Sequence, residues 1–128
     1  TAPDNLVLHG PVTVDKIRDW YLQADVFVLP TLSDGFAITQ LEAMAHGVPV
    51  ITTPNCGDVV EDSADGYIVK PRDAEALATA IRKYLQEPQS LAGHRAAAIR
   101  KSTQFSLDRL FERLVDATTA CRPDPPAS

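Results

Sequence analysis

Residues 26–54, VFVLPTLSDGFAITQLEAMAHGVPVITTP, contain the alternation of elements that decides the fold. The apolar run at residues 26–29 predicts a buried strand, and a small polar loop follows at residues 31–35. A helix is expected from about residue 37 to residue 46, because Gly47 suits the left-handed position that ends a helix. Residues 48–52 then form a second apolar strand, which predicts a parallel pair joined by a right-handed crossover.

The rest of the chain repeats this alternation of short apolar runs and amphipathic segments. Further strands are expected at residues 5–9 and 67–69. Helices are expected after a cap at Thr13 or Asp15, after a cap at Asp73, from Pro88 towards residue 101, and from about residue 106. The sequence therefore predicts an α/β fold, a doubly wound parallel sheet with helices on both faces. Residues 1–121 form the expected domain and residues 122–128 a disordered tail.

Composition limits the classes of function. Twelve Lys and Arg against 17 Asp and Glu give a net charge of −5, and no basic cluster is interleaved with aromatic residues. Nucleic acid is therefore not an expected partner. No apolar run approaches the length of about 20 residues that spans a bilayer. The two cysteines have no metal or redox spacing, which favours reduced thiols and a cytoplasmic location.

The start of the helix expected at residues 37–46 is a candidate anion site. The amides of Phe36, Ala37, Ile38 and Thr39 lack helical acceptors and point out of the carboxyl edge of the sheet. Such amides, together with the helix dipole, bind anions without any Lys. In the alternative interpretation the same amides are capped by side chains of the preceding loop.

Two carboxylates flank these amides. Glu42 lies on a helix that is apolar nearly all round, so burial is expected and the carboxylate needs hydrogen-bond donors, which two ribose hydroxyls would supply. The alternatives are a salt bridge with an Arg or simple exposure. Asp34 either favours the positive end of the helix dipole or accepts hydrogen bonds from sugar hydroxyls beside a bound diphosphate.

The segment Asp34-Gly-Phe-Ala-Ile-Thr-Gln-Leu-Glu42-Ala-Met-Ala-His-Gly-Val-Pro-Val resembles the E-x7-E segment of retaining GT-B glycosyltransferases, family 4 or group 1. The flanking segments NLVLHG at residues 5–10, ADVFVLP at 24–30 and DGYIV at 65–69 agree with that resemblance. It covers about residues 5–101 and implies a partial C-terminal nucleotide-sugar-binding domain, incomplete on its N-terminal side.

The resemblance implies a role for each residue of the segment. Asp34 takes the catalytic position that binds the donor sugar, and Glu42 the ribose-binding position. The amides of Phe36 and Ala37 face the sugar, and those of Ile38 and Thr39 hold the distal phosphate. Gly35 belongs to the same loop, and Gly10 lies against the base. The implied reaction transfers a glycosyl group from a nucleotide sugar, UDP- or GDP-linked, with retention and without a metal or other cofactor.

Two positions depart from the family pattern. The first acid is Asp instead of Glu, and it is shorter by one methylene. Ala37 replaces the usual Gly, so its methyl group crowds the approach of the backbone to a donor. The alternative function is therefore a nucleotide-sugar-binding module or degenerate enzyme without transfer activity. An unrelated doubly wound regulatory domain is disfavoured, because His9 and Gly10 occupy the edge where an acidic cluster would lie.

The resemblance also implies parts that this sequence does not contain. The acceptor-side domain and a basic pair on the diphosphate lie upstream in the family, so the 128 residues alone are expected to be inactive. Peripheral contact with a membrane through that domain is an alternative to a purely cytoplasmic location. The uncovered sheet edge predicts self-association. His9 is expected to pack, and His46 and His94 are expected to face solvent.

Overall fold

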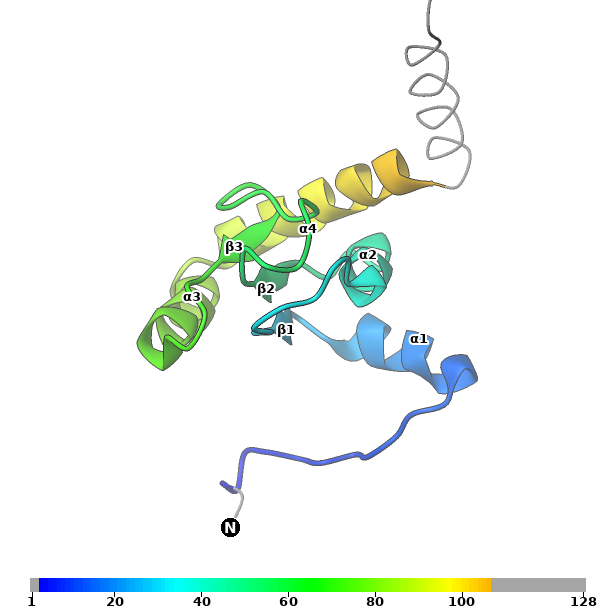
Figure 1. Cartoon of the computed structure of the whole chain (residues 1–128), viewed down its shortest axis with the longest axis horizontal. Helices are drawn as coiled ribbons and strands as arrows, with labels where there is room; N and C mark the ends of the chain where they lie inside the picture. Colours follow the sequence, from blue (N-terminus) through cyan, green and yellow to red (C-terminus); the bar gives the residue numbers. More distant parts are fainter. Residues whose placement is uncertain (1–2, 107–128) are drawn as a thin grey trace, which may run out of the picture.

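The computed structural model describes residues 3–106, and they form a three-stranded parallel sheet flanked by helices (Figure 1). The strands β1 (Phe27–Leu29), β2 (Val50–Thr52) and β3 (Gly66–Ile68) lie side by side in chain order. Phe27 pairs with Val50, and Val50 pairs with Gly66. The α/β class and the parallel arrangement are therefore confirmed.

Both faces of the sheet are covered by helices. Successive residues of β2 point to opposite faces and so belong to different core clusters. Val50 packs in a core cluster with Tyr21 of α1 (Val14–Gln23) and Met44 of α2 (Ile38–Ala45). Ile51 packs in a second cluster with Tyr84 of α3 (Ala74–Gln86). The helix α4 (Pro88–Ser102) contributes to both clusters, and the 3-10 turn η1 (Thr103–Phe105) follows it.

The signals that start and end the helices act largely as the sequence predicts. The Asp73 carboxylate accepts a hydrogen bond of 2.9 Å from the Ala76 amide at the start of α3. Pro88 occupies the first turn of α4. Gly47 follows α2 with a φ of 72°, a left-handed conformation that glycine adopts without strain. Thr13 is the N-cap of α1, although its side chain makes no capping bond.

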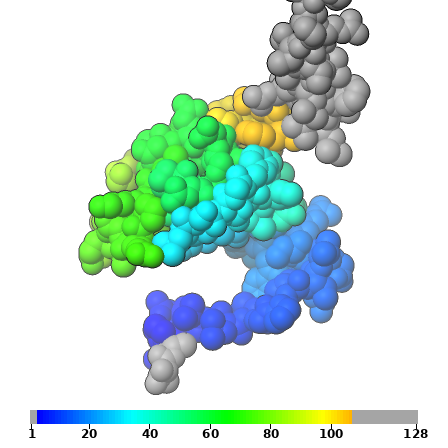
Figure 2. Space-filling view, in the orientation of Figure 1, coloured from blue at the N-terminus to red at the C-terminus, as the bar shows by residue number. Residues whose placement is uncertain are grey.

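The strand expected at residues 5–9 is not formed. Residues 6–10 are irregular, and Leu6, Val7 and Leu8 are exposed. A strand needs a partner for its backbone hydrogen bonds. Within residues 3–106 the sheet consists of β1, β2 and β3, and none of them pairs with this segment. Figure 2 shows the segment, in blue, separated from the body by open space.

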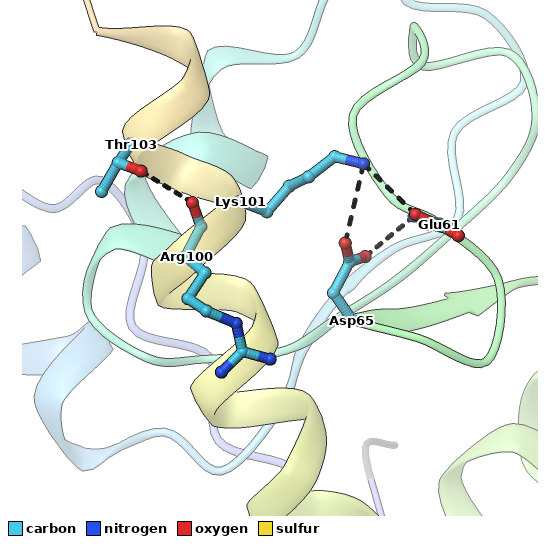
Figure 3. Close-up of polar contacts among 5 residues, drawn as sticks. All are labelled: Glu61, Asp65, Arg100, Lys101 and Thr103. Atoms are coloured by element: carbon cyan, nitrogen blue, oxygen red, sulfur yellow. Dashed lines mark hydrogen bonds and ion pairs between the residues drawn. The ribbon is translucent and has the colours of Figure 1, made fainter.

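An ion-pair cluster fastens α4 to the turn before β3 (Figure 3). Lys101 Nζ lies 3.5 Å from Glu61 Oε2 and 4.0 Å from Asp65 Oδ2. The other Asp65 oxygen accepts a bond of 2.8 Å from the Glu61 amide. Burial raises the pKa of the Asp65 carboxyl, while that amide and Lys101 oppose the rise. The helix and bounds expected from residue 106 onwards, including the tail at 122–128, lie outside the described residues.

Gly66 is where the packing of the sheet leaves no room for a side chain. A Cβ there would collide with the Val50 carbonyl oxygen and lie 2.9 Å from Val60 Cγ1. We expect Gly66→Ala to lower the free energy of unfolding by about 1–3 kcal/mol, because backbone must move to relieve the overlap. Urea denaturation measures the change.

Gly93 provides the matched control for that substitution. It lies inside α4, and a Cβ added there would have nothing within 4 Å of it. Gly93→Ala should therefore raise stability by up to about 1 kcal/mol through helix propensity alone. Equal effects of the two substitutions would contradict the close contact between β3 and β2.

Candidate functional site

The candidate site lies at the carboxyl end of β1 and β2, where ligands bind in open α/β sheets. Two loops emerge there, residues 30–37 between β1 and α2 and residues 53–57 after β2. The first loop holds most of the predicted site residues. The strand pattern also directs attention to the second loop, because it follows the carboxyl end of a strand, although no residue of it was assigned to the donor site.

Three hydrogen bonds fasten these loops together. Thr53 Oγ1 donates to the Thr31 carbonyl at 2.6 Å, and Asn55 Nδ2 donates to the Leu32 carbonyl at 2.8 Å. In return the Asp34 amide donates to the Asn55 carbonyl at 2.9 Å. The backbone at Asp34 is therefore held by the neighbouring loop, while its carboxylate remains exposed.

A buried amide joins the second loop to α2. Gln40 Nε2 donates to the Cys56 carbonyl at 2.8 Å and to the Ala37 carbonyl at 3.3 Å. Both partners are acceptors, which fixes the orientation of the amide group. Cys56 is a buried free thiol, and Thr52 Oγ1 lies 2.9 Å from its sulfur. We call the contacts among residues 31–34, 53–56 and Gln40 the loop clamp.

The first turn of α2 has no side-chain cap. Ala37 is the N-cap residue, and neither Ser33 nor Asp34 accepts a bond from the helix. The Gln40 backbone amide donates back to the Ala37 carbonyl at 3.1 Å, which leaves the amides of Ile38 and Thr39 as the leading donors. The capping alternative considered from the sequence is therefore not what the structure shows.

Glu42 differs from its expected environment. Burial was expected because its helix is apolar nearly all round, but the side chain is exposed. Helix α2 presents this position to solvent, beside α1. No salt bridge to Glu42 occurs among residues 3–106. Its carboxylate instead accepts a hydrogen bond of 3.1 Å from the Tyr21 hydroxyl, which lies 3.4 Å from the Thr39 carbonyl.

Tyr21 is the support of Glu42 that the sequence did not reveal. Its ring is buried, stacks on His46 with centroids 5.4 Å apart, and meets Phe27 edge-on at 5.8 Å. Burial raises the pKa of Tyr21 to about 12, and the hydrogen bond to Glu42 adds to the rise. The phenol thus stays a donor and holds the carboxylate near the first turns of α2. A buried tyrosine generally needs a polar partner, which was the available signal.

The structure brings together Asp34 to Thr39 and Glu42, but not Gly10. Gly10 follows the irregular N-terminal segment with a φ of 64°, and a Cβ added there would have nothing within 4 Å of it. The Phe36 ring is half exposed and lies against Gly57, where a methyl group would be 3.0 Å from Cδ2. Phe36 also faces Phe105, with ring centroids 6.2 Å apart.

The histidines take different positions from one another. His9 packs on Trp20, with centroids 4.0 Å apart. The expectation that His94 faces solvent is wrong, because the turn before β3 covers it. Its Nδ1 lies 2.8 Å from the Tyr84 hydroxyl and its Nε2 lies 3.2 Å from the Ser63 carbonyl. Since a carbonyl only accepts, Nε2 carries the proton and Nδ1 accepts from Tyr84.

Within residues 3–106, no His, Cys, Asp and Glu side chains gather in a group suited to a metal ion. The same part of the chain contains no helix with the length and apolar character required to cross a membrane.

A parallel half-sheet with an uncapped helix start at its carboxyl edge defines the chain as a Rossmann-like α/β domain of the GT-B type. The family model of group 1 glycosyl transferases matches residues 1–87. The chain belongs to this family.

Individual relatives agree with that assignment. D-inositol 3-phosphate glycosyltransferase from Streptomyces griseus is 30% identical over 123 residues, covering 94% of this chain and 26% of the relative. Sucrose-phosphate synthase from Thermosynechococcus elongatus superimposes with a TM-score of 0.80 at 26% identity, covering 93% of this chain and 31% of that one. Anabaena HepE in complex with UDP gives 0.71 at 21% identity, covering 79% and 29%. The chain thus spans about a quarter of the length of its first curated relative.

The ionisation of Tyr21 tests the Tyr21–Glu42 contact. Its pKa is raised from an ordinary 10.0 to about 12, so the neutral phenol stabilises the fold below pH 10. That contribution is lost as the pH rises from 10.0 towards about 12. Urea unfolding of wild type and Tyr21→Phe across this range should show a steeper loss of stability in the wild type.

The other two tyrosines with raised pKa, Tyr67 and Tyr84, are common to both proteins and cancel in the difference. Parallel stability curves for wild type and Tyr21→Phe would contradict the buried, Glu42-bound phenol.

Proposed function

We propose that the chain is the donor half-site of a glycosyltransferase that moves a glycosyl group from a nucleotide sugar to an acceptor with retention at the anomeric carbon. The observation that carries the proposal is the uncapped start of α2 with the Glu42 carboxylate held beside it by Tyr21. Bare amides suit a diphosphate, and an exposed carboxylate suits the two hydroxyls of a ribose. The family membership supports transfer as the reaction.

Each residue then has a defined part. Gly35 forms the turn into α2, and Asp34 immediately before it faces the donor sugar. The amides of Phe36 and Ala37 approach the same sugar. The amides of Ile38 and Thr39 hold the distal phosphate, and Glu42 holds the ribose. Gly10 takes its place against the base only when residues 5–9 join a sheet, since here those residues form no strand.

In this scheme the loop clamp holds the donor-site backbone in position. Electrostatic stabilisation of a leaving diphosphate requires donors that are already in position before reaction. Gln40, Thr53 and Asn55 fix the backbone from which Asp34 and the helix amides project. The rigid frame therefore compensates for the absence of a cationic side chain at the start of α2.

The donor class rests on the relatives. HepE is a UDP complex at 21% identity, so a UDP-sugar is the first candidate and a GDP-sugar the second. The scheme uses no metal or other cofactor. Acceptor binding belongs to a separate N-terminal domain, and the 128 residues alone are inactive in transfer. The open edge of β1 allows self-association, and the location is cytoplasmic or peripheral at a membrane.

Substitution of Glu42 tests the donor site. Glu42→Ala should weaken binding of UDP-glucose, or of whichever nucleotide sugar binds first in a calorimetric series of UDP-, GDP- and ADP-sugars. Loss of hydrogen bonds to a charged group costs about 1.5–3 kcal/mol, which is roughly 10- to 150-fold in the dissociation constant. Titration of the chain with each sugar nucleotide measures the change.

Glu75→Ala is the matched control, because it removes an exposed carboxylate from the first turn of another helix, α3. It should leave the affinity unchanged. Equal affinities for wild type and Glu42→Ala would reject the role given to Glu42, whatever the fold.

The second candidate function is a nucleotide-sugar-binding module without transfer activity, favoured by Asp34 where the family resemblance expects Glu. Asp34 is shorter by one methylene, while the loop clamp prevents its backbone from moving inward. Ala37 is buried, so its methyl group is directed into the protein instead of at the donor edge.

The double substitution Asp34→Glu with Ala37→Gly separates the two functions. For a degenerate module, transfer should rise at least about tenfold when a hydrogen bond to the sugar is restored. For an enzyme adapted to its own donor, transfer should fall. Rates are measured on a protein that joins this chain to an acceptor domain, with Asp34→Asn as the control that removes the charge and keeps the length.

A further inference from the structure

A cavity lies at the carboxyl edge of the sheet, beside the start of α3. It has a volume of about 350 Å³ and lies between the ends of all three strands and the start of α3. Pro30 follows β1, Thr53 follows β2, and Val69 follows β3 on its wall. The cavity lining includes none of the residues assigned to the donor site, which are Gly10, Asp34, residues 35–39 and Glu42. The volume is within the range of small-molecule pockets.

The wall of the cavity combines apolar side chains with two cations. Pro30, Val69 and Leu77 form an apolar surface, while Lys70 and Arg72 supply positive charge. In the part of the chain that the structure describes, neither cation forms a hydrogen bond or salt bridge. The cations of α4 behave differently, because Arg95 pairs with Asp25 and Lys101 with Glu61.

The third charged group on the wall, Asp73, does not neutralise these cations. Its carboxylate accepts the Ala76 amide at 2.9 Å and so acts as the N-cap of α3. Thr53 is engaged as well, since its hydroxyl donates to the Thr31 carbonyl. The side chains left to meet a ligand are therefore Lys70 and Arg72, and the lining carries a net charge of one positive unit.

The backbone at Arg72 is strained. Its φ of 61° lies in the left-handed region, which a long side chain rarely adopts. Strain of this kind persists where the surroundings fix it, and it is concentrated at ligand sites. Here the strained residue is one that lines the cavity. A guanidinium presents paired donors that match two oxygens of a phosphate, and the ammonium of Lys70 adds a point charge.

We propose that this cavity binds a phosphate monoester whose carbon skeleton lies on the apolar wall and whose phosphate meets Arg72 and Lys70. The site is separate from the nucleotide-sugar site and does not depend on it. It is adjacent all the same, because Leu32, which lines the cavity, belongs to the loop that carries Asp34. The phosphate can come from a soluble metabolite or from the headgroup of a lipid.

Glycerol 3-phosphate is the probe for the soluble source, with glycerol as the uncharged control. Titration of the isotopically labelled chain, followed by amide chemical shifts, should move the amides of residues 69, 70, 72–74, 31 and 32 with glycerol 3-phosphate only. Vesicles of phosphatidylcholine with and without phosphatidate test the lipid source by flotation. Binding to either phosphate source supports the site, and binding to neither overturns it.

Arg72→Gly is the decisive variant, because it removes the guanidinium and relieves the left-handed strain together. The variant should unfold at the same or a higher urea concentration than the wild type, so lost binding cannot be assigned to misfolding. We expect affinity for the phosphate probe to fall at least about tenfold. Binding of a UDP-sugar should remain unchanged, which separates this site from the donor site.

Arg82→Ala is the matched control, since it removes one positive charge from α3 at a position outside the cavity. It should keep the affinity of the wild type. Equal losses in Arg72→Gly and Arg82→Ala would show a general effect of net charge and overturn the proposal, as would undiminished binding by Arg72→Gly.

Discussion

The bond from the Gln40 amide to the Cys56 carbonyl is the constraint on which the carboxyl edge of the molecule depends. Both residues are fully buried, and a buried carbonyl left unpaired would cost about 1–3 kcal/mol, so separating the loop after β2 from α2 is unfavourable. That loop in turn holds the backbone before α2 through Thr53 and Asn55. One buried side chain thus sets the relation between two loops and a helix start.

The proposed donor site sets a particular electrostatic problem, because the chain is acidic and the start of α2 offers bare amides instead of a cation. Fixed dipoles can attract a diphosphate without a cation, provided that they do not reorganise when charge develops. The Tyr21 phenol extends the same principle to Glu42, because its raised pKa keeps it a hydrogen-bond donor throughout the physiological range. The helix amides and the Tyr21 phenol thus take the place of mobile charged side chains, and packing fixes their orientation.

Local pattern was enough to predict β1, β2, β3 and the helix between the first two, since apolar runs bounded by Gly47 and Pro30 carry that information themselves. Local pattern was not enough to predict the structure of residues 5–9. A strand needs a neighbouring strand, and an apolar run does not show whether that neighbour is present. Glu42 is exposed, which is one of the alternatives that the sequence left open, because α2 leaves one side uncovered although it is apolar nearly all round. Gln40 and Cys56 meet only through tertiary structure, 16 residues apart along the chain, and no spacing rule connects them.

The free thiol of Cys56 lies at the centre of the loop clamp, buried beside Thr52. A reagent that alkylates sulfur reaches it only after residues 53–57 swing away from α2, which is a local opening with its own free energy. The rate of alkylation of Cys56 therefore reports on this local opening at the carboxyl edge of the sheet. The rate at which Cys56 is labelled, compared with the rate of global unfolding, measures how often the loop clamp opens.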